Sequence, residues 1–175
     1  QNSLAKAFGV NGYSIDAGDR VRLSLGQSYP DQIQRRAGHV VEPADAVIRP
    51  ASLDEATLLL TLAGKHGFTV TAVGGASNVV GAFDIGNDKR ARVIADMTRM
   101  KNVLAICKEN QTVTAEAGIL LPDLEAALAE QGLTFGHFPQ SFNGATLGGS
   151  IACNGAGQRS DGYGRIADNL ISTSL

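Results

Sequence analysis

The first segment of the chain able to do chemistry is a short glycine-rich run that starts at Gly74. It reads Gly-Gly-Ala-Ser-Asn up to Asn78 and follows a stretch rich in β-branched residues. Successive backbone N–H groups that no Cβ shields form a concave anion site, and a diphosphate is its natural occupant. The chain contains neither G-x-G-x-x-G nor G-x-x-x-x-G-K-[ST], which excludes the two common phosphate loops. The alternative interpretation of the run is a tight turn that needs positive φ.

A second run of small residues extends from Pro139 to Gly157. It crosses a loop and enters a short helix that we expect over residues 147–153. Bare backbone at a helix N-terminus favours anions. The run also carries hydroxyl and amide groups that can bind phosphate or a polar ring, at Thr146, Ser150 and Asn154.

Part of this second run has the outline of a hydrolase nucleophile elbow. Residues 148–152 read G-G-S-I-A, with Ser150 in the place of the nucleophile. That motif needs a strand before the serine and a histidine after it in the chain. The candidate histidine, His137, comes before the serine, so a hydrolase is disfavoured.

Composition and charge exclude several other classes. The 175 residues are 43% hydrophobic and 18% charged, which is typical of one globular domain. Lys and Arg number 15 against 17 Asp and Glu, so a general attraction to nucleic acid is excluded. Two cysteines and three histidines without metal-ligand spacing indicate neither a disulfide framework nor a metal site. We expect a cytoplasmic protein without a membrane span, because no apolar run approaches about 20 residues.

The elements that position the first run form a β-α-β unit over residues 46–73. An apolar strand opens the unit, and Ser52 and Glu55 then have the spacing of a capping box. The helix that they start ends at Gly67, a typical C-terminal stop. Residues 68–73 are rich in β-branched side chains and predict a second strand, parallel to the first.

The remaining elements are predicted from similar signals. Residues 92–96 form a further strand, and residues 103–107 and 112–116 form a hairpin. A helix starts around Pro122 and stops at Gly132. Short helices at 21–25 and 29–36 and the start of a strand at 168–171 complete the expected elements.

In this order, the motifs resemble the FAD-binding domain of the vanillyl-alcohol-oxidase / para-cresol-methylhydroxylase (PCMH-type) flavoproteins. Within that superfamily the chain is most similar to alkyldihydroxyacetonephosphate synthase and its bacterial relatives, and next to D-2-hydroxyacid dehydrogenases. The resemblance runs from about Asp19 to the end of the chain. It rests on the stretches Asp45–Pro50, Gly74–Val79, Ala115–Gly118, His137–Ser141, Ala145–Gly149, Cys153–Gly157, Tyr163–Gly164 and Asp168–Leu170.

The resemblance implies an α/β (α+β) fold of two lobes that holds FAD. An N-terminal polar and helical segment, residues 1–45, precedes a complete β-α-β lobe over about 46–100. The second lobe starts at about residue 101 and is truncated at 175. Family members with covalent flavin carry a histidine in the first loop, and this chain has none between Val73 and Gly81. Non-covalent FAD is therefore expected.

The resemblance also implies which residues bind the cofactor. Two glycine-rich loops are expected to hold the FAD pyrophosphate. The family usually has Gly-Gly-Gly-Thr-Ser in the first loop, whereas this chain has Ala76, Ser77 and Asn78 in the last three places. The implied cofactor-binding residues are Val73, Gly74, Gly75, Ala76, Ser77, Asn78, Val79, Pro139, Gln140, Ser141, Ala145, Thr146, Gly149, Cys153, Asn154 and Ala156.

The function that follows is that of the FAD-binding part of a flavin-dependent oxidoreductase or transferase resembling alkyldihydroxyacetonephosphate synthase. A small-molecule substrate and a homodimer are expected for the full-length protein. Because the chain starts at Gln1 and stops at Leu175 just after the expected strand start, we interpret it as a fragment. No catalytic residue is assigned, since the family's acid–base residues lie further along. Three alternatives stay open: a D-2-hydroxyacid dehydrogenase or oxidase, a UDP-N-acetylenolpyruvoylglucosamine reductase-like protein, and a non-catalytic module without flavin.

Individual polar residues of the second half have simpler interpretations. His137 is expected to be a loop histidine hydrogen-bonded to backbone, in preference to a group at the flavin edge. Cys153 is expected to be a small buried residue. Residues 168–169 are expected to fix the turn before the strand. Arg159 and Arg165 are able to reach phosphates, but a solvated position is the default expectation.

Overall fold

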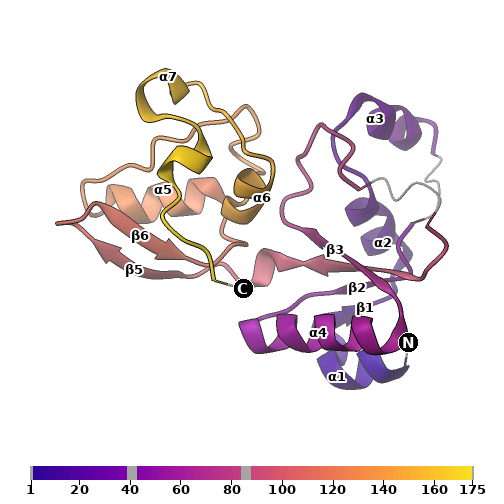
Figure 1. The fold of residues 1–175 in the computed structure, drawn as a ribbon. Coiled ribbons are helices and arrows are strands. Elements are labelled where there is room, and N and C mark those ends of the chain that lie inside the picture. Colours follow the sequence, from indigo (N-terminus) through magenta and orange to yellow (C-terminus); the bar gives the residue numbers. More distant parts are fainter. Residues whose placement is uncertain (1, 39–42, 84–87, 175) are drawn as a thin grey trace. The chain divides into compact units, whose positions relative to one another are not determined.

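The computed structural model describes residues 2–38, 43–83 and 88–174. The chain divides into two compact units, Gln1–Arg99 and Met100–Leu175, and each is described by itself (Figure 1). The elements of unit 1 are α1 (Asn2–Gly12), β1 (Tyr13–Ser14), α2 (Ala17–Ser24), α3 (Tyr29–Arg36), β2 (Ala46–Ile48), α4 (Leu53–His66), β3 (Thr69–Val73), β4 (Arg92–Asp96) and the 3₁₀ helix η1 (Met97–Arg99).

The strands of unit 1 form one sheet in the order β1-β2-β4-β3. Strands β2 and β3 both run parallel to β4, and β1 runs antiparallel to β2. The prediction of parallel strands on either side of α4 is confirmed, but β4 lies between them in the sheet. The carboxyl ends of β2, β3 and β4 therefore meet at one edge, where ligands bind in open α/β sheets.

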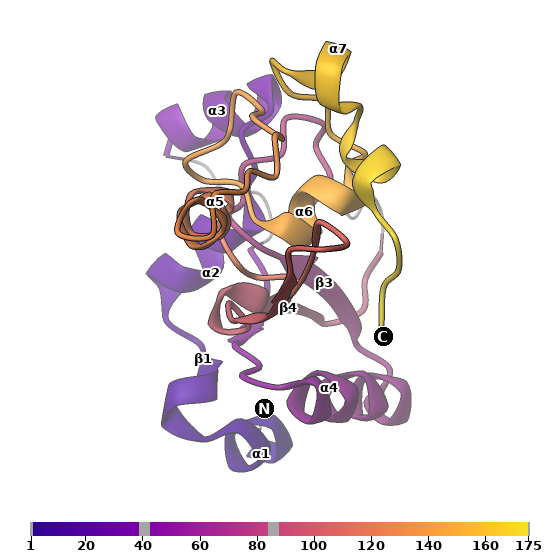
Figure 2. The same cartoon turned by 90° about the vertical axis from the view of Figure 1, so that its left-hand side faces the viewer.

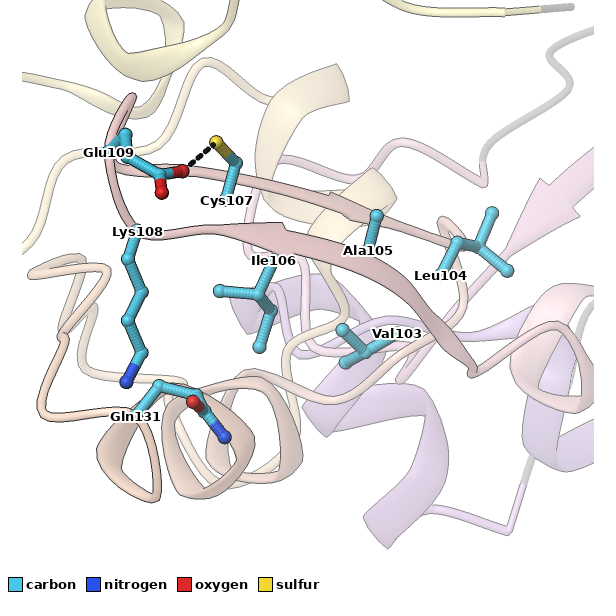
Figure 3. Close-up of a pocket in the computed structure, with 8 residues that line it drawn as sticks. All are labelled: Val103, Leu104, Ala105, Ile106, Cys107, Lys108, Glu109 and Gln131. Carbon is cyan, nitrogen blue, oxygen red and sulfur yellow. Dashed lines mark hydrogen bonds between the residues drawn. The ribbon is translucent and has the colours of Figure 1, made fainter.

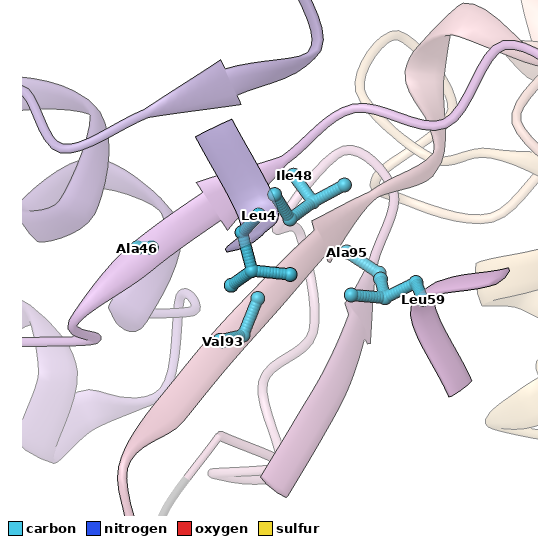
Figure 4. Packing of buried hydrophobic residues seen from close by; sticks show 6 residues of the cluster. All are labelled: Leu4, Ala46, Ile48, Leu59, Val93 and Ala95. Atoms are coloured by element: carbon cyan, nitrogen blue, oxygen red, sulfur yellow. The ribbon is translucent and has the colours of Figure 1, made fainter. Parts of the chain in front are cut away.

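Alternating side chains of these strands form cores on both faces of the sheet. Ala46, Ile48, Val93 and Ala95 pack on one face with Leu4 of α1 and Leu59 of α4 (Figure 4). The other face holds Val47, Val73 and Ile94 with Leu23 of α2 and Ala44. Both ribbon views agree, with α1 and α4 on one side of the strands and α2 and α3 on the other (Figures 1 and 2). Because strand side chains alternate with period two, burial on both faces explains why the three central residues of β4, Val93, Ile94 and Ala95, are all apolar.

Helix α4 begins and ends at its predicted residues. The Ser52 hydroxyl accepts a hydrogen bond from the Glu55 N–H at 3.2 Å. The Glu55 carboxylate accepts from the Ala51 N–H at 2.8 Å, one residue earlier than a standard capping box predicts. Gly67 closes the helix at φ 71° and donates its N–H to the Ala63 carbonyl at 2.8 Å. Glycine suits this position because it adopts left-handed backbone without a Cβ penalty.

Unit 2 is built on the predicted hairpin and a helix packed against it. Ile119, Leu124 and Leu128 are buried against the inward side chains of the hairpin, and Figure 1 shows α5 lying along the two strands. The strands pair antiparallel with an irregularity between Val103 and Ala105. The elements are β5 (Val103–Cys107), β6 (Thr112–Ala115), α5 (Leu121–Ala129), α6 (Leu147–Ala152), α7 (Ser160–Tyr163) and the 3₁₀ helix η2 (Ile166–Asn169).

Two local structures differ from the expectations. The strand start expected at 168–171 is wrong, because residues 166–169 form a 3₁₀ turn and Ile171 is exposed without regular structure. The Asp168 carboxylate accepts from the Arg165 N–H at 2.7 Å and closes the turn. Helix α1 was not predicted, and its helical geometry is interrupted at Gly9. No helix in the described ranges has both the length and the apolar character to cross a membrane.

Candidate functional site: two glycine-rich loops

The first loop leaves the carboxyl edge of the sheet directly after β3. Val73 is buried and pairs in register with Asp96, and the loop from Gly74 to Asn78 follows it. Within the described part of the chain, none of the five amide groups from 74 to 78 donates to another group of the protein. These unpaired donors at a ligand-binding edge fit the anionic diphosphate of a dinucleotide.

The backbone of this loop is bent at Ala76 and not at a glycine. Ala76 has φ 52°, whereas neither Gly74 nor Gly75 has positive φ. A left-handed residue with a Cβ costs roughly 1–2 kcal/mol. The loop therefore combines the two interpretations of its sequence: it contains a turn with positive φ, and it also has consecutive unpaired amides that are able to bind an anion.

Asn78 ends the loop and is held at several atoms. Its Oδ1 accepts a hydrogen bond from the Ala82 N–H at 3.0 Å, and its backbone carbonyl accepts from the Gln27 N–H at 2.7 Å. Its Nδ2 is buried with no hydrogen-bond partner. Val79, the next expected cofactor residue, is 69% exposed. Hydrogen bonds thus fix the loop at Asn78, and the next residue is exposed to solvent.

The second loop is a series of turns that satisfy their own backbone. The Pro139 carbonyl accepts from the Phe142 N–H at 3.0 Å, and the Ser141 carbonyl accepts from the amides of Gly144 and Ala145 at 2.8 Å each. Ala145 is buried and its carbonyl accepts from the Leu121 N–H at 3.0 Å. Gln140 and Asn143 are exposed at this end of the loop, and Ser141 is half-buried.

The N-terminus of α6 is not the open anion site that the sequence suggested. The amides of Leu147 and Gly148 donate to carbonyls of the preceding segment at 2.9 and 2.7 Å. The Gly149 N–H donates to the Thr146 hydroxyl at 3.2 Å, and Thr146 is only 2% exposed. Ser150 is also buried. Because the protein itself occupies these donors, this helix end offers a ligand little free backbone.

The loop after α6 is more exposed than expected. Cys153 is an exposed free thiol, which corrects the prediction of a buried residue. Asn154 and Ala156 are also exposed, and Asn154 adopts φ 45°. The turn is held by the Gly155 N–H, which donates to the Ser150 carbonyl at 3.1 Å. These three exposed side chains are accessible to a ligand, and their role in holding the cofactor stays a prediction.

His137 differs from its predicted role as a hydrogen-bonded loop residue. It is 2% exposed, and neither of its ring nitrogens has a hydrogen-bond partner. Its ring meets Phe135 edge-on with centroids 6.1 Å apart, and a Cβ added at Gly155 would lie 3.5 Å from its Nε2. Burial lowers the pKa of His137 below 6.5, because an apolar environment disfavours the charged imidazolium.

Arg159 is engaged in a cation–π contact. Its guanidinium lies 4.9 Å from the ring centroid of Phe138. Phe138 also packs against Phe142 at 5.1 Å between centroids. Both arginines considered for phosphate are exposed, which agrees with the default expectation of a solvated position, and the guanidinium of Arg159 in addition lies over an aromatic face.

An ion-pair cluster near the first loop was missed by sequence reasoning. Arg49, which follows β2, donates to Asp19 at 2.8 Å and to Asp96 at 3.2 Å. The hydrogen bond from Arg49 lowers the pKa of Asp19 below 3.8, against the opposing effect of partial burial. Sequence offers little signal for this cluster, because its members come from α2 and from the ends of two parallel strands.

The hairpin of unit 2 has a shallow hollow that none of the expected cofactor residues lines (Figure 3). At its rim the Cys107 thiol lies 3.4 Å from the Glu109 carboxylate. No group of three or more metal-ligating side chains gathers within residues 2–38, 43–83 and 88–174. His39 lies outside these ranges. The lining residues are Val103, Leu104, Ala105, Ile106, Cys107, Lys108, Glu109 and Gln131.

The fold and the first loop together define a flavin-binding domain. Residues 44–175 match the sequence model of the FAD binding domain family. The chain belongs to this family, and its resemblance to the PCMH-type flavoproteins is confirmed. FAD is the cofactor that the family binds, and the unpaired amides of the first loop fit its diphosphate.

Among individual proteins, the chain is similar to alkyldihydroxyacetonephosphate synthase. It is 38% identical to that of Dictyostelium discoideum over 153 residues, which is 87% of this chain and 25% of the relative. A solved alkyldihydroxyacetonephosphate synthase structure superposes with a TM-score of 0.90 at 36% identity, over 95% of this chain and 31% of that one. The glycolate oxidase subunit of Bacillus subtilis is 30% identical over 131 residues, 75% of this chain and 27% of the relative. The chain thus spans about a quarter to a third of these proteins.

Proposed function

We propose that this chain is the part of a flavoenzyme that binds FAD, and that the whole protein acts like alkyldihydroxyacetonephosphate synthase. The observation that carries the proposal is the loop from Gly74 to Asn78, whose five amides are unpaired at the carboxyl edge of a parallel sheet. FAD when bound supplies the redox chemistry, and the protein binds and orients it. The similarity to alkyldihydroxyacetonephosphate synthases supports the second half of the proposal.

The two loops contribute in different ways to this proposed binding. The first loop offers backbone N–H groups and the Ser77 hydroxyl to the diphosphate. The second loop offers its exposed polar side chains, chiefly Gln140 and Asn154, while Ala145 and Thr146 are buried and hold its turns. No histidine is present from 73 to 81, which supports non-covalent FAD.

A charge placed in the first loop tests the proposal. In the full-length protein, Ser77→Asp puts a carboxylate among the amides that we assign to the diphosphate. A repulsion of about 2–3 kcal/mol raises the Kd for FAD roughly 30- to 150-fold. Ser3→Asp, at an exposed position of α1, is the matched control and leaves the Kd within twofold.

The measurement is titration of the apoprotein with FAD, followed by the change in flavin fluorescence and absorbance. Acid precipitation of the holoprotein then releases FAD into the supernatant if the flavin is non-covalent. Equal FAD affinity in Ser77→Asp and wild type refutes the assignment of the loop. A full-length wild type that binds no FAD refutes the flavoenzyme and favours a module without flavin.

A second candidate activity is that of a D-2-hydroxyacid dehydrogenase or oxidase. The similarity to the glycolate oxidase subunit of Bacillus subtilis favours it. The two activities separate on one preparation of holoprotein. Formation of alkyldihydroxyacetonephosphate supports the first, whereas bleaching of the flavin by a D-2-hydroxyacid under anaerobic conditions supports the second.

We also propose that the full-length protein acts on a small molecule as a cytoplasmic homodimer. Light scattering coupled to size-exclusion chromatography measures the mass of the assembly. A monomeric mass at micromolar concentration overturns the dimer, and recovery of the protein in the membrane fraction of its host overturns the location.

A further inference from the structure

We propose that residues Gly26 to Ser28, which connect α2 to α3, are a positioning element that sets the geometry of the FAD diphosphate loop through Asn78. The proposal rests on the proposed FAD-binding function and adds residues that lie before the family match, which begins at residue 44. It assigns a binding role to a segment that the sequence describes only as polar and helical.

The connection contacts both the backbone and the side chain of Asn78 in the loop. The Gln27 N–H donates to the Asn78 carbonyl at 2.7 Å. Gly26 is buried against the same residue, and a Cβ added there would lie 2.7 Å from both Nδ2 and the carbonyl oxygen of Asn78. Gly26 does not have positive φ, so the close approach and not backbone freedom requires glycine at this position.

The connection is itself anchored and therefore able to impose a position. Leu25 and Ser28 are 5% and 6% exposed. The Ser28 hydroxyl caps α3 by accepting from the Asp31 N–H at 3.3 Å, and the Asp31 carboxylate accepts from the Ser28 hydroxyl at 2.7 Å. From the last turn of α3, the Arg35 guanidinium donates to the Gly26 carbonyl at 3.1 Å. These contacts hold the Gly26 and Gln27 backbone on both sides of its contact with the loop.

The loop needs such a support for a physical reason. Its amides have no partners among the residues that the structure describes, and its bend falls on Ala76 with a left-handed φ. A loop with few internal hydrogen bonds and a strained residue keeps one shape only when neighbouring structure determines it. Asn78 is the residue through which neighbouring structure holds the loop, since its carbonyl accepts from the Gln27 N–H and its side-chain oxygen accepts from the Ala82 N–H four residues further along.

Two glycine variants in the full-length protein test the contact. Gly26→Ala forces Asn78 to move, and we expect the Kd for FAD to rise at least tenfold. Gly64→Ala makes the same change on the exposed face of α4, where a Cβ meets nothing within 4 Å, and is expected to leave the Kd within twofold. The ³¹P NMR signals of the bound FAD diphosphate shift in the first variant and stay in place in the second. That signature reports loop geometry and does not follow from a loss of stability alone.

A milder pair of variants covers the case in which Gly26→Ala does not fold. Arg35→Gln removes the anchor on the Gly26 carbonyl without a steric clash, and we expect the Kd for FAD to rise about threefold to tenfold. Arg36→Gln, one residue further along α3, is the control. In the apoprotein, hydrogen exchange of the Gln27 amide, which donates to the Asn78 carbonyl, is expected to be faster in Arg35→Gln and unchanged in Arg36→Gln.

The outcomes separate this proposal from the proposed function. If wild type binds FAD and Arg35→Gln matches it in Kd, in ³¹P signals and in amide exchange, the positioning role is overturned while FAD binding stands. If wild type binds no FAD, the proposed function falls and the role in FAD binding falls with it. Faster exchange of the Gln27 amide in Arg35→Gln together with weaker FAD binding supports both.

Discussion

Substitution of the buried imidazole of His137 gives a sharp test of how the second unit is packed. Both ring nitrogens of His137 lack partners at 2% exposure. A buried polar group without a hydrogen bond costs about 1–3 kcal/mol, whereas an apolar replacement of similar volume costs under about 1.5 kcal/mol in packing. We therefore expect His137→Leu to keep the free energy of unfolding at pH 7.5 within about 1.5 kcal/mol of wild type or to raise it.

The pH dependence of this residue has a definite sign. Burial lowers the folded-state pKa of His137 below 6.5, so the unfolded chain takes up a proton first as the pH falls. Stability is complete above pH 6.5 and decreases below it, with a slope of at most about 1.4 kcal/mol per pH unit, until the folded state is protonated as well. The Glu125 carboxylate of α5 already accepts hydrogen bonds from the amides of Phe135 and Gly136 and from the Thr134 hydroxyl.

Urea denaturation of the chain at pH 5.0 to 7.5 measures both the effect of the substitution on stability and its pH dependence. Unfolding is followed by far-ultraviolet circular dichroism, because the chain has no tryptophan for fluorescence. His137→Leu should remove the loss of stability below pH 6.5, and His66→Gln, at an exposed position of α4, should retain it. The pKa of Asp88 lies at about 2, below this window. Parallel curves for wild type and His137→Leu, or a loss above about 3 kcal/mol at pH 7.5, would refute the reasoning.

Two further substitutions address stability, each with its own control. Arg49→Met leaves the buried carboxylate of Asp96 without its cation. Breaking a buried pair costs about 3–5 kcal/mol of unfolding free energy. Because Arg49 is partly exposed, we expect a loss of about 2–3 kcal/mol. Arg22→Met, at a side chain 61% exposed, should cost under about 0.5 kcal/mol in the same denaturation series, and equal losses in the two variants contradict the role of the buried pair. Gly157→Ala places a Cβ 2.8 Å from backbone atoms and should cost about 2 kcal/mol or more. Gly162→Ala, in α7 with open space around it, should be neutral or stabilising by up to about 1 kcal/mol, so a melting temperature lowered equally by both alanines rules out the close contact.

Local signals in the sequence predicted most of the elements, because their causes lie within a few residues. Ser52 and Gly67 fix the ends of α4 by contacts three or four residues away. The predicted strand over residues 92–96 has the observed bounds of β4, and both predicted strands of the hairpin agree with the observed ends to within a residue. The resemblance to PCMH-type flavoproteins rested on ordered motifs and is confirmed by the family match.

The predictions that failed depend on contacts between distant residues. Nothing near residue 168 shows that a strand is absent there, since a capping carboxylate and a strand start have similar local sequence. The buried state of His137 depends on packing by Phe135 and Gly155. The position of β4 between β2 and β3 depends on which strands pair, and the local sequence does not specify this. Helix α1 was not predicted because it lacks the charges near its ends that complement a helix dipole.

The two glycine-rich loops look alike in sequence, but their hydrogen bonds assign them different tasks. In the second loop the amides of Ala145, Leu147 and Gly148 all donate to the protein, so the glycines and small residues there permit close packing. In the first loop the amides stay unpaired around a left-handed Ala76, and Gln27 fixes its end. A backbone arranged before its ligand arrives loses less entropy on binding than a loop that must order itself. If Gly26 to Ser28 position the loop as we propose, the connection between α2 and α3 contributes to cofactor affinity although the family match begins only at residue 44.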